Sequence, residues 1–538
     1  MADPASAPQE RTFMGHPTQL LMLFFAELWE RFSFYGMRAL LTLYLTTQLF
    51  KSLGDEEAKS TAVGIYAAYG ALVYATPFLG GILADKVLGF KRSTMLGAVL
   101  MAIGHFIMAI ETEPMLYAAL AFLIVGNGFF KPNISSMVGG LYKPGDSRRD
   151  GAFTIFYLGI NIGAFLAPLT CGYLGETYGW SLGFGLAGIG MLAGLAVFGW
   201  GQGSLGDNGE PNDPEMLKKW GKVVYAGAFA AVALFGAMVW QYEYMSAVLT
   251  PFVVGVVGFL IIEAIRRGGE ERDRLFVVVI LLFFSTVFWA FFEQAGSSLT
   301  LFTNSNVDRS ILGAEVKASM FQSVNPFFIM LLAFPFSYMW TELGKRKLEP
   351  NTPVKFGLGL AQLGLGFLVL AWSTGFVEVK DITMASGDEL VTVTAATVPV
   401  FFLLAGYFLH TTGELCLSPV GLSMVTKLAP KKIGAMVMGA WFLSSAAAHH
   451  IAGIIAKLTT GSGHGEGAAG EADAVGQIAL DAGLIPSLDA HPEAVLASFD
   501  SLATATDVFG SLGWIALGCG AVVLVISPLL KKMMHGIN

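Results

Sequence analysis

Four charged residues interrupt the first long apolar stretch of the chain. They are Glu27, Glu30, Arg31 and Arg38. Each costs about 2.5–3.5 kcal/mol at the centre of a bilayer, so it must face protein or a watery cavity and find a partner. At helical spacing Glu27, Arg31 and Arg38 share one face, and Tyr35 lies on that face too. A purely structural ion pair needs fewer charges, so we expect this set to handle protons or an ionic solute.

Five more polar residues fall within apolar segments. Lys131 needs a carboxylate or an anionic ligand; alternatively, it is a lysine that reaches for water from a helix end. Glu293 is a lone acid in an aromatic span, and because burial disfavours its charged form it suits a proton carrier. Glu414 is similar, with a helix break expected after it. Asn161 fits an interhelical hydrogen bond as well as a ligand contact. The proline after Asn325 is expected to break its span.

The buried acids outnumber the buried bases by one. The acids are Glu27, Glu30, Glu293 and Glu414, and the bases are Arg31, Arg38 and Lys131. Protonating one carboxylate costs less than keeping it charged and unpaired in a low dielectric. A ligand with both an amine and a carboxylate could replace internal ion pairs without changing this balance. The count therefore favours a proton-coupled carrier of zwitterions with low specificity for the solute.

The composition is that of a polytopic membrane protein. Of 538 residues, 54% are hydrophobic and 13% are charged, whereas soluble domains are about 25% charged. The three cysteines lie in apolar runs without ligand spacing, and no cleavable signal peptide is expected. HExxH, GxSxG and nucleotide-binding motifs are missing, which disfavours an enzyme or an ATP-driven pump. We expect no cofactor, no metal and no nucleic-acid partner.

Fourteen apolar segments are long enough to span a bilayer. They cover residues 18–49, 60–84, 93–111, 115–138, 151–175, 180–200, 222–240, 246–265, 275–302, 317–341, 352–373, 396–419, 432–458 and 505–530. Most of the 32 lysines and arginines fall in alternate connections, and these are the cytoplasmic ones if the chain begins in the cytoplasm. We therefore expect both termini to be cytoplasmic.

A weak internal repeat predicts two six-helix halves. Residues 77–92 and 335–347 both pass from a helix end through an acid to a basic turn. Two such halves around a central site are typical of alternating access. The predicted parts are an N-terminal tail 1–16, a bundle 17–200, a linker with two peripheral inserted helices 201–273, a bundle 274–532 and a tail 533–538. The second bundle includes an acidic external loop, 459–505, which we expect to be partly disordered, and we expect a short hairpin within 374–395.

Two motifs make the sequence recognisable. Glu27-x-x-Glu30-Arg31-Phe32 with Phe34-Tyr35-Gly36 resembles the ExxERF-YYG signature of the proton-coupled oligopeptide transporters, a family of the major facilitator superfamily. The segment Phe156-Tyr157-x-x-Ile160-Asn161-x-Gly163 resembles the family's second signature. The resemblance runs from about Gly15 to Lys532 and is closest to prokaryotic members. It implies an all-α fold of two six-helix bundles plus an inserted helix pair.

The resemblance also implies roles for individual residues. Proton coupling would involve Glu27, Glu30, Arg31, Lys131 and Glu293. Peptide binding would involve Tyr35, Arg38, Tyr74, Lys131, Tyr157, Asn161, Trp289, Glu293, Asn325, Glu414, Ser418 and Trp441. Gating would involve Asp85, in a loop resembling that of the superfamily, with Arg38, Glu293, Lys131 and Glu414. Lys131 would pair with Glu30 or, across the inner gate, with Glu414. Arg38 would pair with Glu293 when the outer gate shuts.

Two departures from the family pattern are visible. Phe34 stands where the family often has a second tyrosine, and the second span has no histidine, so a histidine-based proton site of the animal type is not expected. The resemblance implies proton-driven symport of di- and tripeptides in the bacterial inner membrane by a functional monomer. The alternative is a family member that carries nitrate, a glucoside or another organic anion.

Overall fold

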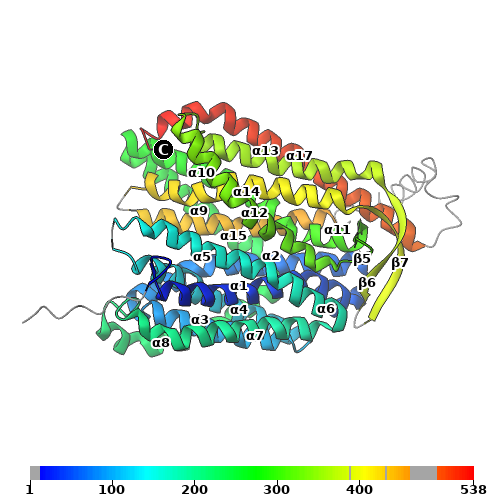
Figure 1. Ribbon diagram of the computed structural model, residues 1–538, viewed down its shortest axis with the longest axis horizontal. Helices are drawn as coiled ribbons and strands as arrows, with labels where there is room; N and C mark the ends of the chain where they lie inside the picture. Colours follow the sequence, from blue (N-terminus) through cyan, green and yellow to red (C-terminus); the bar gives the residue numbers. More distant parts are fainter. Residues whose placement is uncertain (1–11, 144, 387–388, 431–432, 461–492, 538) are drawn as a thin grey trace, which may run out of the picture.

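The computed structural model describes residues 12–143, 145–386, 389–430, 433–460 and 493–537. Within these residues, fourteen long helices run side by side (Figure 1). The first six are α1 Gln19–Tyr44, α2 Asp55–Leu83, α3 Phe90–Met108, α4 Glu113–Gly140, α5 Arg148–Ala167 with its continuation α6 Tyr173–Tyr178, and α7 Trp180–Gly201. The others are α8 Pro214–Trp240, α9 Met245–Arg267, α10 Gly269–Phe292 with its continuation α11 Ser298–Asn306, α12 Val324–Lys345, α13 Thr352–Trp372, α14 Val400–Leu428, α15 Gly434–Leu458 and α17 Glu493–Met533.

The predicted spans are confirmed as helices, with differences at some ends. Eleven helical segments of the described chain are long and apolar enough to cross a membrane, and α1, with its four charges, is not one of them. The expected break after Glu414 is wrong, because α14 continues to Leu428. The predicted span 317–341 is interrupted next to Asn325, where a 3₁₀ helix, Ala318–Ser323, gives way to α12 at Val324. The proline after Asn325 does not itself break α12, because it lies in the first turn, where proline is tolerated. The last helix begins at Glu493, so the predicted loop 459–505 extends too far; residues 461–492 lie outside the described chain.

The helices bury two separate hydrophobic cores. One is built mainly from residues 20–205 and the other mainly from residues 260–534. In Figure 1 the first group (α1–α7) lies below the second group (α10, α13, α14 and α17). The groups meet where α2 packs along α15 and where α5 packs against α12. A site between the groups can therefore be reached from α1, α2 and α5 on one side and from α10, α12 and α14 on the other.

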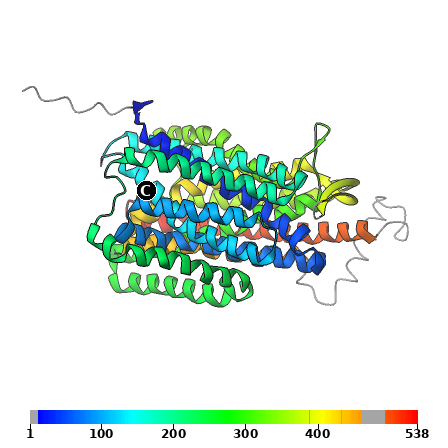
Figure 2. The same ribbon diagram turned by 90° about the horizontal axis from the view of Figure 1, so that it is seen from below.

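The two inserted helices lie at the edge of the molecule. Figure 2 shows α8 and α9 as a green pair outside the other helices. Helix α8 contacts α4, and α9 contacts α10 and α15. Only 11% of the apolar window of α8 and 17% of that of α9 is buried. Such long, exposed apolar surfaces are suited to lipid contact.

A β-hairpin covers one end of the helices (Figure 1). Its strands, β6 Glu378–Ser386 and β7 Glu389–Pro399, pair antiparallel, and β3 Val307–Asp308 pairs parallel with β7. The hairpin predicted within 374–395 is thus confirmed, and it is longer. The amide of Ala396 donates to Ser498 Oγ at 2.8 Å, which fastens β7 to α17. We call this end the hairpin end; the C-terminus lies at the other end. The remaining short strands are β1 Thr12–Phe13, β2 His16–Pro17, β4 Ser310–Ile311 and β5 Ala314–Glu315.

Candidate functional site

A cavity of about 180 Å³ lies between the two helix groups. The predicted site residues that line it are Tyr35, Arg38, Tyr74, Tyr157, Asn161, Trp289, Glu293, Asn325, Glu414 and Ser418. Two predicted binding residues, Lys131 and Trp441, are not among the lining residues. The buried Trp441 instead packs on α14, where a Cβ on Gly421 would come within 2.5 Å of its ring. The cavity thus gathers most of the predicted residues from six helices.

Two of the predicted acids and one arginine form a buried cluster on α1. Glu27, Glu30 and Arg31 are all buried. Arg31 Nε lies 3.1 Å from Glu27 Oε1 and also pairs with Glu30 Oε2. The second oxygen of each carboxylate has no hydrogen-bond partner among the described residues. Two carboxylates thus share one guanidinium, an arrangement that a proton on either acid would bring to neutrality.

The second family motif explains how α5 reaches this cluster. A Cβ on Gly163 would lie 2.4 Å from the backbone oxygen of Leu28 and 3.1 Å from Arg31 Cβ. Only glycine therefore permits this approach of α5 to α1. Asn161, one half-turn earlier, is buried and lines the cavity, and its amide donates to the backbone oxygen of Tyr157 at 2.9 Å.

Lys131 lies beside the cavity against an aromatic ring. Its Nζ is 4.3 Å from the centroid of Tyr74, a cation–π distance. Within the described chain it has no carboxylate within 4.0 Å, and Glu30 is paired with Arg31 instead. The ion pairs implied with Glu30 and Glu414 are therefore not formed in this structure. Tyr74 lines the cavity, and Lys131 contacts its ring without lining the cavity itself.

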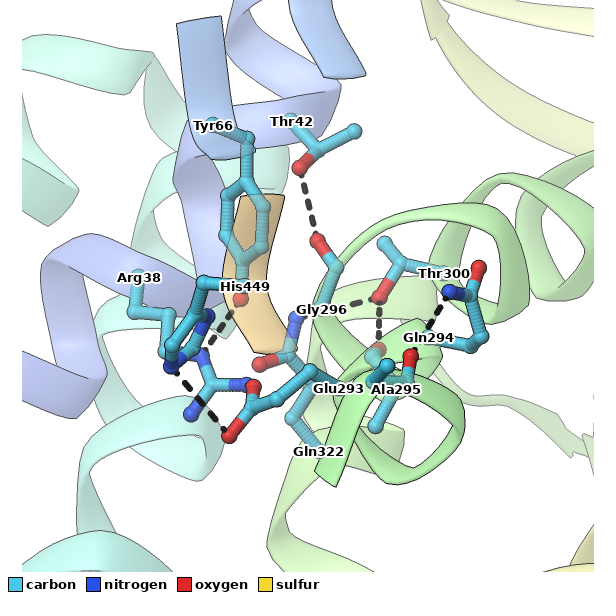
Figure 3. A network of polar contacts seen from close by, with 11 residues as sticks. Arg38, Thr42, Tyr66, Glu293, Gln294, Ala295, Gly296, Thr300, Gln322 and His449 are labelled. Atoms are coloured by element: carbon cyan, nitrogen blue, oxygen red, sulfur yellow. Dashed lines mark hydrogen bonds and ion pairs between the residues drawn. The ribbon is translucent and has the colours of Figure 1, made fainter. Parts of the chain in front are cut away.

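Arg38 and Glu293 form a buried ion pair between the two groups (Figure 3). Arg38 Nε also donates to Tyr66 Oη at 2.6 Å. Glu293 opens a 3₁₀ turn, Glu293–Gly296, that separates α10 from α11. The predicted span 275–302 is thus interrupted at the acid itself. This break turns Glu293 and the carbonyl of Gly296 toward α1, where Thr42 Oγ1 donates to that carbonyl at 2.7 Å.

Contacts beyond this pair close the hairpin end. The amide of Ser319 donates to Glu176 Oε1 at 2.8 Å, across the two groups. A Cβ on Gly172 would lie 2.4 Å from Ser319 Oγ, and a Cβ on Gly296 would lie 1.8 Å from Tyr66 Oη. At this end the backbone of each group therefore lies in contact with a side chain of the other group. The structure is a state that is shut at the hairpin end.

The acidic wall of the cavity is made by Glu414 and Asn325. Asn325 Nδ2 donates to Glu414 Oε2 at 2.9 Å and contacts Thr411 Oγ1 at 3.0 Å. Glu414 is buried and lines the cavity together with Ser418. Arg38 lies on the other helix group. The cavity can therefore offer a cationic group and an anionic group to one small dipolar ligand.

Asp85, predicted to take part in gating, lies away from the cavity lining. It is exposed in a π-helical turn after α2, and its carboxylate and backbone oxygens both accept from Asn212 Nδ2 at 3.2 Å. Nearby, Lys91 and Arg92 pair with Glu210 at 3.0 and 2.9 Å. The segment that follows α7, which contains Glu210 and Asn212, is thus held across the turn that contains Asp85. We call this segment the strap.

Sequence reasoning missed several residues of the site. Tyr66 holds Arg38, Gln322 and Tyr407 line the cavity, and His449 of α15 lies 3.7 Å from Glu293 through its Nε2. The expectation of no animal-type histidine proton site rested on the second span, which has no histidine. The sequence nevertheless carried a signal, because two adjacent histidines occur in the mainly apolar α15.

Comparisons with known proteins identify the family of this chain. A sequence model of the POT family matches residues 91–468. The peptide transporter YePEPT of Yersinia enterocolitica is 38% identical over 477 residues, which cover 85% of this chain and 90% of that protein. Dipeptide and tripeptide permease B of Aliivibrio fischeri is 30% identical over 526 residues, 97% of this chain and 96% of that one. A crystal structure of a peptide transporter POT with sulfate matches with a TM-score of 0.74 at 35% identity, over 98% of both chains. The chain is therefore a multi-span membrane transporter, not an enzyme, and it belongs to the POT family of proton-coupled oligopeptide transporters.

Proposed function

We propose that this protein imports di- and tripeptides together with protons. The observation that carries the proposal is the cavity between the two helix groups, which has Arg38 on one side and Glu414 on the other. Both ends of a peptide zwitterion would find a partner of opposite charge there. At about 180 Å³ the cavity is below the roughly 300–1,000 Å³ of typical ligand sites, which favours a very short peptide. The names of relatives as peptide permeases support this substrate class.

Recognition would rest on the peptide backbone rather than on side chains. Arg38, with Lys131 nearby, would hold the carboxylate. Glu414, with Asn325 and Asn161, would hold the amino terminus. The side chains would meet the remaining lining residues Tyr35, Tyr74, Tyr157, Trp289 and Ser418. Because these walls are mostly aromatic and make few fixed polar contacts, one site could accept many side chains.

Protons would act through the buried acids. Glu27 and Glu30 share Arg31, so one of them can take a proton without leaving a base unpaired. Protonation of Glu293 would remove its attraction to Arg38 and release the hairpin end. The parts 17–200 and 274–532 would then rock about the cavity, with Lys131, Glu414 and Asp85 acting at the opposite gate. Trp441 would reach the ligand only after such a movement.

We further propose that the protein works as a monomer in the cell membrane with both termini in the cytoplasm. The alternation of lysine and arginine between connections supports this orientation. The hairpin end would then face outward, and the present state would be shut to the outside.

Uptake of labelled dialanine into proteoliposomes tests the proposal. We expect accumulation that needs an inwardly directed proton gradient, is abolished by a protonophore and is competed by trialanine but not by free alanine. Vesicles that bind dialanine but take it up equally without a gradient would contradict proton coupling. If the vesicles take up no peptide but accumulate nitrate or a glucoside together with protons, the alternative carrier on the same fold would be favoured.

A further inference from the structure

His449 is buried beside the ion pair that closes the hairpin end (Figure 3). Its Nε2 lies 3.7 Å from Glu293 Oε1, and its ring stacks on Tyr74 with centroids 4.5 Å apart and planes 29° apart. Its Nδ1 has no hydrogen-bond partner among the described residues. Burying a polar atom without a partner costs folding free energy, so this imidazole calls for a role beyond packing.

Helix α2 leaves a slot for this ring. A Cβ on Gly70 would lie 2.7 Å from His449 Nδ1 and 2.9 Å from its Cγ. No larger residue could stand at position 70 without displacing the imidazole. The slot fixes the ring between α2 and the turn that holds Glu293, so that Nε2 faces the carboxylate.

Charged and titratable groups surround His449 from four elements. Glu293 contacts it from the turn after α10, and Tyr74 stacks on it from α2. Arg38 of α1 is bound to the same carboxylate, and Lys131 of α4 lies against Tyr74. A continuous row therefore runs from Lys131 through Tyr74 and His449 to the gate. In this row, the imidazole is the group whose ring nitrogens can accept a proton and pass it on to a neighbouring carboxylate.

We propose that His449 delivers the coupling proton to Glu293. In this step the imidazolium Nε2–H gives its proton to Glu293 Oε1, which leaves a neutral imidazole and a neutral carboxylic acid. The acid no longer attracts Arg38 as a carboxylate does, and the closed end can open. The proton on His449 comes from water that reaches the site when the hairpin end is open. The step rests on the proposed proton symport, and it requires Nε2 and Oε1 to approach from 3.7 Å to about 3 Å.

Replacing His449 by phenylalanine tests this role. His449→Phe keeps an aromatic ring for the stack on Tyr74 but cannot carry a proton. We expect gradient-driven dialanine uptake to fall at least tenfold and the pH dependence of uptake to flatten, while counterflow exchange of dialanine stays within about twofold. The control is His450→Phe, because the His450 ring bonds Ser246 of α9 at 2.7 Å rather than Glu293; it should keep both activities.

Two results would overturn the proposal. One is His449→Phe with gradient-driven uptake and pH profile like those of the unaltered protein. The other is equal loss of uptake and counterflow in a folded variant, which would make His449 a packing or binding residue. If His449→Phe does not fold, His449→Gln is judged by the same two readouts. Failure of the proposed function itself would be visible separately, since the unaltered protein would then take up no dialanine with a gradient.

Discussion

Arg38 and Glu293 are 255 positions apart in the sequence, and they form a buried ion pair that joins the two helix groups. Tyr66 fixes the guanidinium from a third helix, at 2.6 Å. Breaking such a pair by removing one charge typically costs about 3–5 kcal/mol, because the other charge is left buried and alone. The pair therefore holds the two helix groups together strongly while Glu293 is ionised, and weakly once Glu293 is protonated.

Glu293→Gln is expected to uncouple transport from protons. The amide keeps the size of the side chain but imitates the protonated acid permanently. Gradient-driven uptake of dialanine should be abolished, whereas counterflow, which needs no net proton movement, should be spared. The control Glu263→Gln, at the end of the inserted helix α9, should behave like the unaltered protein. Equal loss of uptake and counterflow would argue that Glu293 is not a pure proton carrier.

Lys131→Ala is expected to weaken binding and coupling together. The ammonium group contacts Tyr74, which lines the cavity, and we propose that it helps to hold the peptide carboxylate. A charged hydrogen bond is worth about 1.5–3 kcal/mol, so calorimetry with dialanine should give a roughly ten- to hundredfold weaker affinity. Lys219, which lies 5.6 Å from Trp220 on α8, offers a matched lysine–aromatic control in Lys219→Ala. An unchanged affinity in Lys131→Ala would remove Lys131 from the site.

Residue type and helical spacing were enough to predict much of the site. Charged and amide groups are costly in lipid unless they face protein or water, so Arg38, Glu293, Asn325 and Glu414 could be predicted as site residues from the sequence. All four line one cavity. The hairpin was predicted from alternating Val and Thr, a pattern of period two.

Other features depend on contacts between distant helices and were not predictable in this way. The break at Glu293 has no proline or glycine before it, and it is stabilised by Thr42 of another helix. Trp441 has the type of a pocket residue, but packing against Gly421 hides it here. His449 matters through its distance to Glu293, which no local pattern of α15 encodes.

Glu414→Gln is expected to remove the requirement for a free amino terminus. The carboxylate of Glu414 is positioned by Asn325 at 2.9 Å, and a cationic ligand group would neutralise it. In competition assays the unaltered protein should prefer dialanine over N-acetyl-dialanine by about tenfold or more, since a buried charge would otherwise stay unpaired. The variant should lose affinity for dialanine and discriminate little between the two. A variant that keeps the full preference would place the amino terminus elsewhere.

Gly296→Ala is expected to hold the hairpin end open. A Cβ there would lie 1.8 Å from Tyr66 Oη, which is far inside contact distance. Spin labels placed on the exposed residues Tyr178 of α6 and Glu378 of β6 should report a longer distance in the variant. Gly375→Ala is the control, because nothing lies within 4 Å of a Cβ at that position. Identical distance distributions in both variants would mean that the end closes without this contact.

Glu210 is expected to make the strap after α7 sensitive to acid. Hydrogen bonds from Lys91 and Arg92 lower the pKa of Glu210 below its ordinary value. A lowered folded-state pKa means that the stabilisation is complete above the unfolded pKa, about 4.3, and is lost as the pH falls through the folded one. Gly89, with φ +75°, keeps the strap close, since a Cβ there would lie 2.6 Å from Pro211 N.

Thermal unfolding in detergent between pH 7 and pH 3 checks this prediction. Glu210→Gln should lower the stability at pH 7 by about 0.2–1 kcal/mol, as expected for exposed ion pairs, and should flatten its decline below about pH 4.3. Glu215→Gln serves as the control, because Glu215 pairs only with Lys218 of its own helix among the described residues. If both variants lose stability equally and keep the same acid slope, the ion pairs of Glu210 do not fasten the strap. If only Glu210→Gln changes the slope, the strap is held by charge, and the turn of Asp85 beneath it is restrained from the same side.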